Sequence, residues 1–467
     1  MTIRKGKLIT VLCWAMLFFR FTAIAQQKAT VHYVTLEEGE NIPGNPVKEY
    51  GLSEKGEGNQ TILLYPEAEF QTITGVGGAF NEIGGLALAS LPKGEQKRVI
   101  SNLFGEAGAY FTLCRTAIGS SDFGVDAYSY DETPNDFGMK DFSVDRDKKS
   151  VIPFIKLALK YNPDMALFAS PWSPPGWMKY SGLMDRGIEF PEKNRLKSDK
   201  RIYEAYALYM AKYVKVYKKY GIDIDRILVQ NETDISTKYP SCVMPPAQMY
   251  EFVSEHMRPA FGKYRLDTEI WAGTFRTHGT LDAIEFAGSD EYLKSVDGIG
   301  IQYTNTQYIN DMNVLKGPKP AMHTEGVCYN GDNTVGQAFA RLGEIASYIN
   351  SGIPNFCYWN MILDETGKSG WDWKQNSLIN IDRGQKTVTY NPDYAVMALF
   401  GKYMEPGMRR IASYAHETVI TLKKENTVHV FVKNESGKAK RYTLKVKGGD
   451  SAEATVPPHS MAVIVLK

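Results

Sequence analysis

Eight short apolar runs alternate with amphipathic helical stretches through the middle of the chain. This alternation is the pattern of a parallel α/β fold. Arg201–Tyr220 and Val335–Asn350 show helical spacing, and a glycine follows each within two residues. Eight strands with intervening helices predict a (β/α)8 TIM barrel, whose active site lies at the C-terminal ends of its strands. The predicted strands are Gly75–Phe80, Phe111–Gly119, Met165–Trp172, Arg226–Glu232, Thr268–Phe275, Asp297–Tyr303, Pro320–Gly326 and Asn355–Met361.

The two flanks of this region, about Thr30–Thr72 and Met408–Lys467, lack helical periodicity. The C-terminal flank alternates apolar and polar residues in Thr418–Leu422 and again in Val428–Val432, as antiparallel strands do. We expect the flanks to pair in a small side β-sandwich. Its N-terminal strands are predicted in residues 26–72 and its C-terminal strands in 401–467, with the barrel in 73–400.

Residues 1–25 are predicted to be a cleavable signal peptide. Arg4, Lys5 and Lys7 precede the apolar run Leu8–Phe19, and small residues at Ala23–Ala25 suit cleavage. The run is too short to favour a transmembrane segment over a signal, and no second candidate follows. We therefore expect an exported protein, periplasmic or secreted if the source is bacterial.

Charge and cysteine usage narrow the class of partner. The formal net charge is +1, and loss of four positive charges with the signal leaves about −3. Without a long basic run, nucleic acid is a poor candidate partner, and a neutral polar substrate fits better. The four remaining cysteines lack the close spacing of a metal site, and the histidines are scattered. We expect no metal and no other cofactor, and the oligomeric state stays open.

Two glutamates end predicted strands and carry the chemistry of the chain. Glu232 closes the fourth strand and Glu325 the seventh, so both should face the same barrel mouth. Two carboxyl groups across one pocket can break a glycosidic bond, because one protonates the leaving oxygen while the other attacks or stabilises the sugar cation. A separation of about 5–5.5 Å predicts retention of configuration, and about 6.5–9.5 Å predicts inversion. The residues alone leave this choice open.

Several ordered motifs resemble glycoside hydrolase family 30, the retaining family that includes lysosomal glucosylceramidase. The string ASPWSPPGWMK at residues 169–179 is the most specific match. QTITGVGGAF at 71–80 resembles the glycine-rich first strand, and RTAIGSSDF at 115–123 with YSY at 128–130 resembles the second-strand segment. FGKY at 400–403 resembles the exit from the barrel. The matches extend nearly end to end through the mature chain.

The resemblance implies a role for each matching residue. Glu232 matches the acid/base and Glu325 the nucleophile, while Asn231 matches the residue that contacts the sugar 2-hydroxyl. A further set is expected to bind substrate or to support the carboxylates. Asp122 and Trp172 would hold the sugar, Trp359 would be the aromatic floor on which the ring packs, Gln302 and Tyr303 would line the site, and Arg115 would brace the carboxylates.

Three positions depart from the family pattern. Gln302 stands where many relatives carry histidine, so the charge near Glu325 should differ. Thr233 follows Glu232 where relatives usually have proline, so the loop after the fourth strand is expected to take another path. The segment Ala272–Arg276 lacks the acidic residues of glucosylceramidase. All three bear on which substrate fits.

The resemblance implies a retaining β-glycosidase that works through a covalent glycosyl–glutamate intermediate. A β-glucosidase or glucosylceramidase-like activity is favoured, because Asp122 and Trp172 lie in segments that closely resemble that branch. The alternative within the family is an endo-β-1,6-glucanase, or a β-xylosidase or β-fucosidase. An alternative of another class is an inactive carbohydrate-binding protein on the same fold. Retention of both glutamates argues against it.

Overall fold

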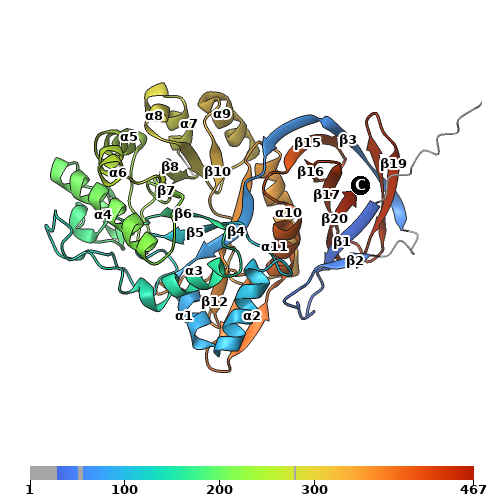
Figure 1. The fold of residues 1–467 in the computed structure, drawn as a ribbon, viewed down its shortest axis with the longest axis horizontal. Helices are drawn as coiled ribbons and strands as arrows, with labels where there is room; N and C mark the ends of the chain where they lie inside the picture. The colour runs from blue at the N-terminus through green and yellow to red at the C-terminus, as the bar shows by residue number, and fades with distance from the viewer. Residues whose placement is uncertain (1–28, 51–55, 278–279) are drawn as a thin grey trace, which may run out of the picture.

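The computed structural model describes residues 29–50, 56–277 and 280–467, and it consists of a barrel with a β-sheet domain beside it (Figure 1). The predicted fold class is confirmed. The predicted signal peptide lies outside the described residues. The eight barrel strands are all parallel: β4 (Gly75–Phe80), β5 (Leu113–Ala117), β6 (Ala166–Ser170), β7 (Arg226–Leu228), β8 (Glu269–Phe275), β9 (Gly298–Ile301), β10 (Ala321–His323) and β11 (Asn355–Asn360).

The barrel closes in two different ways at its last strand. β11 pairs with β4 through a backbone ladder. Between β10 and β11 the Asn355 side chain replaces the ladder: its Nδ2 donates to the His323 carbonyl at 2.7 Å, and its Oδ1 accepts from the His323 N–H at 3.0 Å. On β4, a Cβ at Gly77 would lie 2.1 Å from the Leu113 carbonyl oxygen, so β5 can approach only a glycine there.

The barrel helices surround the strands. α4 follows the predicted pattern, because Tyr206, Tyr209, Tyr213 and Tyr217 all lie on its buried face. A capping box of Thr334 and Gln337 starts α10. The helices are α1 (Glu82–Ser90), α2 (Lys93–Phe104), α3 (Val151–Leu159), α4 (Lys200–Lys219), α5 (Pro246–Phe252), α6 (Arg258–Tyr264), α7 (Asp282–Ala287), α8 (Asp290–Ser295), α9 (Thr306–Lys316), α10 (Val335–Ile349) and α11 (Pro392–Tyr403).

The side domain is one nine-stranded sheet that brings both flanks together. Its strand order is β19-β18-β3-β15-β16-β17-β20-β1-β2. The sheet folds around a core of its own that includes Val31, Ile62, Val430 and Ile464. The strands are β1 (Ala29–Thr35), β2 (Lys48–Tyr50), β3 (Glu57–Thr72), β15 (Arg409–Tyr414), β16 (Ile420–Lys424), β17 (Thr427–Asn434), β18 (Lys440–Val446), β19 (Ser451–Val456) and β20 (Ser460–Leu466).

The side sheet is packed firmly on the barrel. Phe431 of β17 stacks on Phe400 of α11 with ring centroids 4.6 Å apart, and both belong to the barrel's own hydrophobic core. The predicted bound at 400/401 therefore falls inside α11. A small sheet of β12 (Ile362–Asp364), β13 (Ile379–Asp382) and β14 (Thr387–Tyr390) follows β11.

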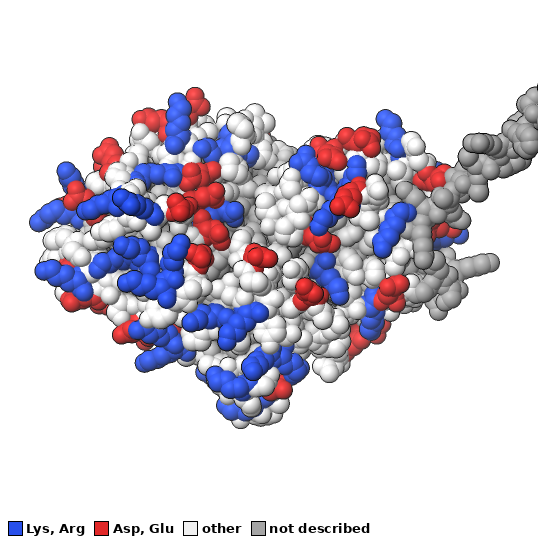
Figure 2. All heavy atoms as spheres, in the orientation of Figure 1, with Lys and Arg blue, Asp and Glu red and all other residues white. Residues whose placement is uncertain are grey.

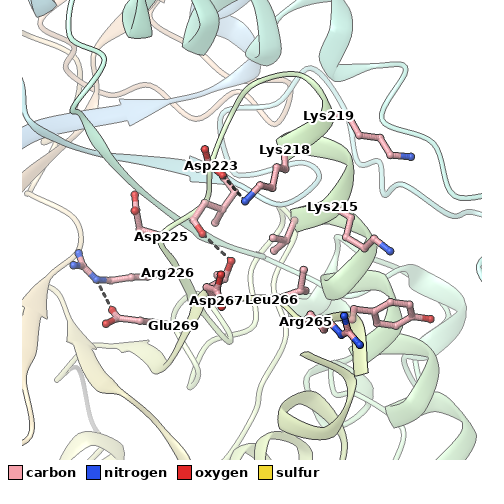
Figure 3. A pocket seen from close by; sticks show the side chains of 14 residues that line it. Lys215, Lys218, Lys219, Asp223, Asp225, Arg226, Arg265, Leu266, Asp267 and Glu269 are labelled. Atoms are coloured by element: carbon pink, nitrogen blue, oxygen red, sulfur yellow. Dashed lines mark hydrogen bonds and ion pairs between the residues drawn. The ribbon is translucent and has the colours of Figure 1, made fainter. Parts of the chain in front are cut away.

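Charged side chains of both signs are spread over the barrel and the side domain on the face seen in Figure 2. A hollow of about 740 Å³ lies where β7 and β8 begin, next to the C-terminal end of α4 (Figure 3). Charged residues there are paired, as Asp223 is with Lys218 at 3.2 Å and Arg226 with Glu269 at 2.8 Å. This hollow lies at the end of the barrel opposite to Glu232 and Glu325. Within the described ranges, no helix is both long and apolar enough to cross a membrane.

Candidate active site

Irregular strand ends turn the two glutamates into the barrel mouth. β7 stops at Leu228, four residues before Glu232, and Asn231 then rejoins the neighbouring strand through a bridge to Thr274. Glu232 has a positive φ of 43°, and its N–H donates to Thr274 Oγ1 at 3.1 Å. β10 likewise stops at His323, two residues before Glu325. Both carboxyl groups are buried, so neither is an ordinary surface charge.

Arg115, on β5, ties the ends of three other strands together. Its Nη1 donates to Glu325 Oε2 at 2.6 Å, and its Nη2 donates to Asn231 Oδ1 at 2.7 Å. Ser170 Oγ, at the end of β6, accepts from Nη2 at 2.6 Å and from Nε at 3.1 Å. The guanidinium is fully buried and lies 4.5 Å from the ring centroid of Trp172. A charge held in this way cannot move without breaking several hydrogen bonds.

The surroundings of Glu325 favour its ionised form against the effect of burial. Burial raises the pKa of Glu325, whereas Arg115, the Tyr303 hydroxyl and the Gln302 amide all oppose the rise. Tyr303 donates a very short hydrogen bond to Glu325 Oε1, and Gln302 Nε2 lies 3.5 Å from Glu325 Oε2. A carboxylate with donors on both oxygens is held in one orientation.

The surroundings of Glu232 favour its protonated form. Burial raises the pKa of Glu232 to about 8, and the neighbouring Glu325 and Asp234 carboxylates contribute to the rise. Arg276 opposes it, but its Nε is 4.0 Å from Glu232 Oε1 and only 2.9 Å from Asp234 Oδ1. Much of the charge of Arg276 is therefore directed to Asp234. Burial thus raises the pKa of both carboxyl groups, but hydrogen-bond donors oppose the rise only at Glu325, which is the difference that a nucleophile and an acid require.

Asp122, Trp172 and Trp359 form a polar and aromatic wall beside the carboxyl pair. The Trp172 and Trp359 rings stack with centroids 4.9 Å apart. Burial raises the pKa of Asp122, and Glu325 and Glu232 raise it further. The Trp359 indole opposes this rise, although no well-aligned hydrogen bond joins the two groups. Asp122 Oδ1 and Trp359 Nε1 are both buried without a partner among the described residues, so an acceptor and a donor remain for a ligand.

The residues that depart from the family pattern have defined places in the structure. The Gln302 carbonyl accepts from Thr324 Oγ1 at 2.7 Å, which leaves its amide nitrogen toward Glu325. Thr233 Oγ1 donates to Asp282 Oδ2 at 2.9 Å and so joins the loop after β7 to the start of α7. Arg276, in the segment Ala272–Arg276 that lacks acidic residues, supplies a cation beside Glu232 instead.

Five residues near the carboxyl pair are absent from the sequence-based prediction. Ser170 and Thr274 hold Arg115, Asn231 and the Glu232 backbone. Asp234 and Arg276 set the charge beside Glu232. The fifth is Tyr239, whose hydroxyl pKa is raised by burial and by the carboxylates of Glu232, Asp122 and Glu325. Ser170 lies inside a quoted motif and Thr274 at a predicted strand end, so position alone could have indicated these two.

Comparison with known proteins agrees with this geometry. Residues 73–268 match the model of the glycosyl hydrolase family 30 TIM-barrel domain. The chain is 27% identical to putative glucosylceramidase 3 of Caenorhabditis elegans, over 95% of this chain and 89% of the relative. It is also 27% identical to endo-1,6-beta-D-glucanase neg1 of Aspergillus fumigatus, over 85% of each chain. The solved structure of an endo-β1,6-glucanase has the same fold, with a TM-score of 0.79 at 21% identity over 94% of this chain and 98% of that one.

A parallel barrel with two buried carboxyl groups at the strand ends defines the chain as a glycoside hydrolase. The match of residues 73–268 to the glycosyl hydrolase family 30 domain confirms the resemblance seen in the motifs.

Proposed function

We propose that the protein is a retaining β-glycosidase that hydrolyses β-glucosidic bonds through a covalent glycosyl–Glu325 intermediate. The observation that carries this proposal is the contrast between the two carboxyl groups. Glu325 accepts from Arg115 and Tyr303, while the pKa of Glu232 is raised to about 8. The proposed roles require an ionised Glu325 and a protonated Glu232 near neutral pH, and the hydrogen-bond donors on Glu325 and the raised pKa of Glu232 support them.

The reaction proceeds in two displacements. In the first, a Glu325 oxygen bonds to the anomeric carbon while the bond to the leaving oxygen breaks, and Glu232 transfers its proton to that oxygen. In the second, the ionised Glu232 takes a proton from water as the water oxygen attacks the anomeric carbon. The ester bond to Glu325 breaks in the same step, and Glu232 is protonated again. The sugar leaves with its original configuration.

The other site residues bind and orient the sugar. Asn231 Oδ1 accepts from both Arg115 and Thr274, so its amide nitrogen is left to donate to the sugar 2-hydroxyl. Asp122 hydrogen-bonds to sugar hydroxyls, and Trp359, which is fully buried, can donate through Nε1. Trp172 supports Trp359 by stacking on it.

The favoured substrate is a β-glucoside cut from an aglycone or a chain end, as the glucosylceramidase relative suggests. Internal cleavage of a β-1,6-glucan is the second candidate, and the Aspergillus fumigatus relative supports it. Product analysis on β-glucosides, β-xylosides, β-fucosides and a β-1,6-glucan separates these activities. Glucose as the sole early product would support the first candidate, and early oligosaccharides from the glucan would support the second.

Substitution of the two glutamates tests their roles. Glu325→Gln should lower hydrolysis by several orders of magnitude without unfolding the protein, and full activity would exclude Glu325 as nucleophile. Glu232→Ala should retain more turnover on an activated aryl glycoside than on a natural glycoside, because a good leaving group needs little acid assistance. Equal losses on both substrates would contradict the acid role. A wild-type protein that binds glycosides but hydrolyses none would favour the inactive carbohydrate-binding alternative.

We also propose that the protein is exported through the cleavable signal in residues 1–25. The basic start and the short apolar run support this proposal. N-terminal sequencing of protein from the source cells tests it. A mature chain that begins at Gln26 is the expected result, and a retained Met1 would contradict it.

A further inference from the structure

We propose that Tyr239 and Trp373 form the binding site for the leaving group, and that its occupant is a second sugar ring. This inference rests on the proposed glycosidase function and adds a substrate class to it. Tyr239 lies in the loop after β7, and Trp373 lies between β12 and β13. Their ring centroids are 6.1 Å apart with an interplanar angle of 51°.

The two rings lead from the carboxyl pair toward solvent. Tyr239 is half-buried, and its hydroxyl is close enough to Glu232, Asp122 and Glu325 for all three to raise its pKa. Trp373 lies beyond it and is 39% exposed. A group that leaves a sugar held between Glu232 and Glu325 would meet Tyr239 first and Trp373 next.

Both rings are held by a single segment after β6. The Arg186 N–H donates to the Lys238 carbonyl at 3.0 Å, directly before Tyr239. The neighbouring Asp185 accepts from Trp371 Nε1 at 3.1 Å, two residues before Trp373. Two consecutive residues therefore fix both loops, although these loops lie more than 100 positions apart in the sequence.

Further contacts make each loop rigid. Lys179 is buried and donates to the Ser241 carbonyl at 2.6 Å, which supports the Tyr239 loop from below. On the other side, Gly370 donates to the Gly124 carbonyl at 3.0 Å, and a Cβ at Gly370 would lie 1.8 Å from the Val125 carbonyl oxygen. An exposed tryptophan on such a fixed loop can bind a ligand at little entropic cost.

The polar groups around Trp373 favour a sugar over a lipid chain. Lys238 Nζ lies 5.8 Å from its ring centroid, and its chain neighbours are Asp372 and Lys374. A pyranose has an apolar C–H face that can pack on the Trp373 ring. Its hydroxyl groups can hydrogen-bond to the charged side chains around that ring. An acyl chain would need a continuous apolar groove, and it would desolvate these charges without pairing them.

The test compares two substrates that share the glucosyl group. One is the β-linked glucose disaccharide that the wild-type protein cleaves best, and the other is β-glucosyl fluoride, whose leaving group makes no contact with the rings. Trp373→Ala should lower kcat/KM on the disaccharide about three- to tenfold, the range of a lost aromatic contact. Activity on the fluoride should stay within about twofold. Trp373→Phe should keep most of the disaccharide activity.

Tyr414→Ala is the matched control, because Tyr414 is an exposed aromatic residue on the side domain (57% exposed). It should change neither substrate. Equal kinetics of Trp373→Ala and wild type on the disaccharide, or equal losses on both substrates, would overturn the inference. A loss confined to a long-chain alkyl β-glucoside would show a lipid occupant and would overturn it too. A wild-type protein that hydrolyses neither substrate would overturn the proposed function itself.

Transfer to an added sugar gives an independent readout. When glucose replaces water in the second displacement, its hydroxyl oxygen attacks the anomeric carbon, the bond to Glu325 breaks and the hydroxyl proton passes to Glu232. The acceptor must occupy the leaving-group site. With β-glucosyl fluoride as donor, Trp373→Ala should lower the ratio of transfer to hydrolysis about three- to tenfold. An unchanged ratio would contradict the proposal that Trp373 binds the acceptor sugar.

Discussion

Arg115 Nη1 lies 2.6 Å from Glu325 Oε2, and the pair is shielded from water on both sides, since neither side chain is more than 6% exposed. The second nitrogen of the same guanidinium binds Asn231, directly before Glu232. One cation therefore holds both glutamates in position and also influences the charge of both carboxyl groups. An arginine suits this task because its planar fork can bind two acceptors at fixed angles.

Arg115→Gln should shift the acid limb of the pH–rate profile to higher pH. Arg115 opposes the rise that burial causes in the pKa of Glu325, so its removal lets that pKa increase. The nucleophile must be ionised, and a higher pH is then needed to ionise it. We expect kcat to fall about 10²- to 10³-fold as well, the range of a lost preorganised electrostatic contact. Profiles on an aryl β-glucoside, with circular dichroism as a fold check, measure both effects.

Arg226→Gln provides the control for this substitution, because Arg226 pairs with Glu269 at the opposite end of the barrel. Its acid limb should match that of wild type. An Arg115→Gln profile with an unmoved acid limb would show that the arginine has only a structural role.

Arg276 and Asp234 should move the alkaline limb in opposite directions. Activity is lost as Glu232 ionises, with its pKa raised to about 8. Arg276 opposes that rise and Asp234 contributes to it. Arg276→Gln should therefore shift the limb upward and Asp234→Asn downward, by about 0.5–1 pH unit each. Both variants remove the ion pair between Arg276 and Asp234. Shifts in the same direction would therefore show that loss of this pair, and not the charge of each residue, moves the limb.

The sequence carries enough information for the fold because periodicity is a local signal. Gly75–Phe80 has the predicted bounds, and the other barrel strands lie inside the predicted runs, β8 starting one residue late. The runs through Glu232 and Glu325 were predicted too long, since β7 and β10 stop at Leu228 and His323. Past these points the backbone leaves the ladder and binds side chains such as Thr274 Oγ1 instead.

The site residues likewise fall into those that the sequence predicts and those that it does not. Eight of the nine predicted site residues lie near the C-terminal ends of barrel strands or in the segments that follow them, and Arg115 lies in the middle of β5. Arg276 and Tyr239 depend on loop paths and on partners such as Asp234 and Trp373, which no periodicity encodes. The closure of β10 on β11 through the Asn355 side chain has no sequence signal either, because it replaces a backbone ladder.

Glu232→Gln should stabilise the folded protein at alkaline pH. The pKa of Glu232 is raised from an ordinary value of 4.5 to about 8, so the folded state retains a proton that the unfolded state releases. Its contribution is fully present below about pH 4.5 and is lost as pH rises through about 8. Each pKa unit corresponds to about 1.4 kcal/mol, which sets an upper bound of roughly 4–5 kcal/mol.

Urea unfolding at pH 5 and pH 9 measures this effect. The variant should exceed wild type by about 1–3 kcal/mol at pH 9 and by less at pH 5. Asp223→Asn, which changes an exposed carboxylate in the hollow of Figure 3, is the control and should show no such pH dependence. Equal stability of Glu232→Gln and wild type at pH 9 would contradict the raised pKa.

Arg341→Met should destabilise the fold and also disturb Glu325. Arg341, on α10, is fully buried, and it binds Asp393 at 3.0 Å, Glu344 at a very short distance and the Val327 carbonyl at 2.8 Å. Glu344 also accepts from the Val327 N–H at 2.7 Å. Arg341 and Glu344 therefore hold the backbone two residues after Glu325. Removal of the cation leaves the buried Asp393 carboxylate and the part-buried Glu344 carboxylate without their ion-pair partner, which costs about 3–5 kcal/mol in urea unfolding. The reference is Arg98→Met, which breaks an exposed pair with Glu95 and should cost less than about 1 kcal/mol.

A second substitution separates charge from packing at this position. In Arg341→Met with Asp393→Leu, one unpaired carboxylate is removed, and part of the lost stability should return because an apolar pair of similar volume is tolerated. The hydrogen bond from Arg341 to the Val327 carbonyl is not restored, so kcat of the folded protein should stay below that of the wild type. Recovery of both stability and kcat would show that Arg341 acts on Glu325 only through global stability. Recovery of stability alone would show that the ion network also positions the segment that carries the nucleophile.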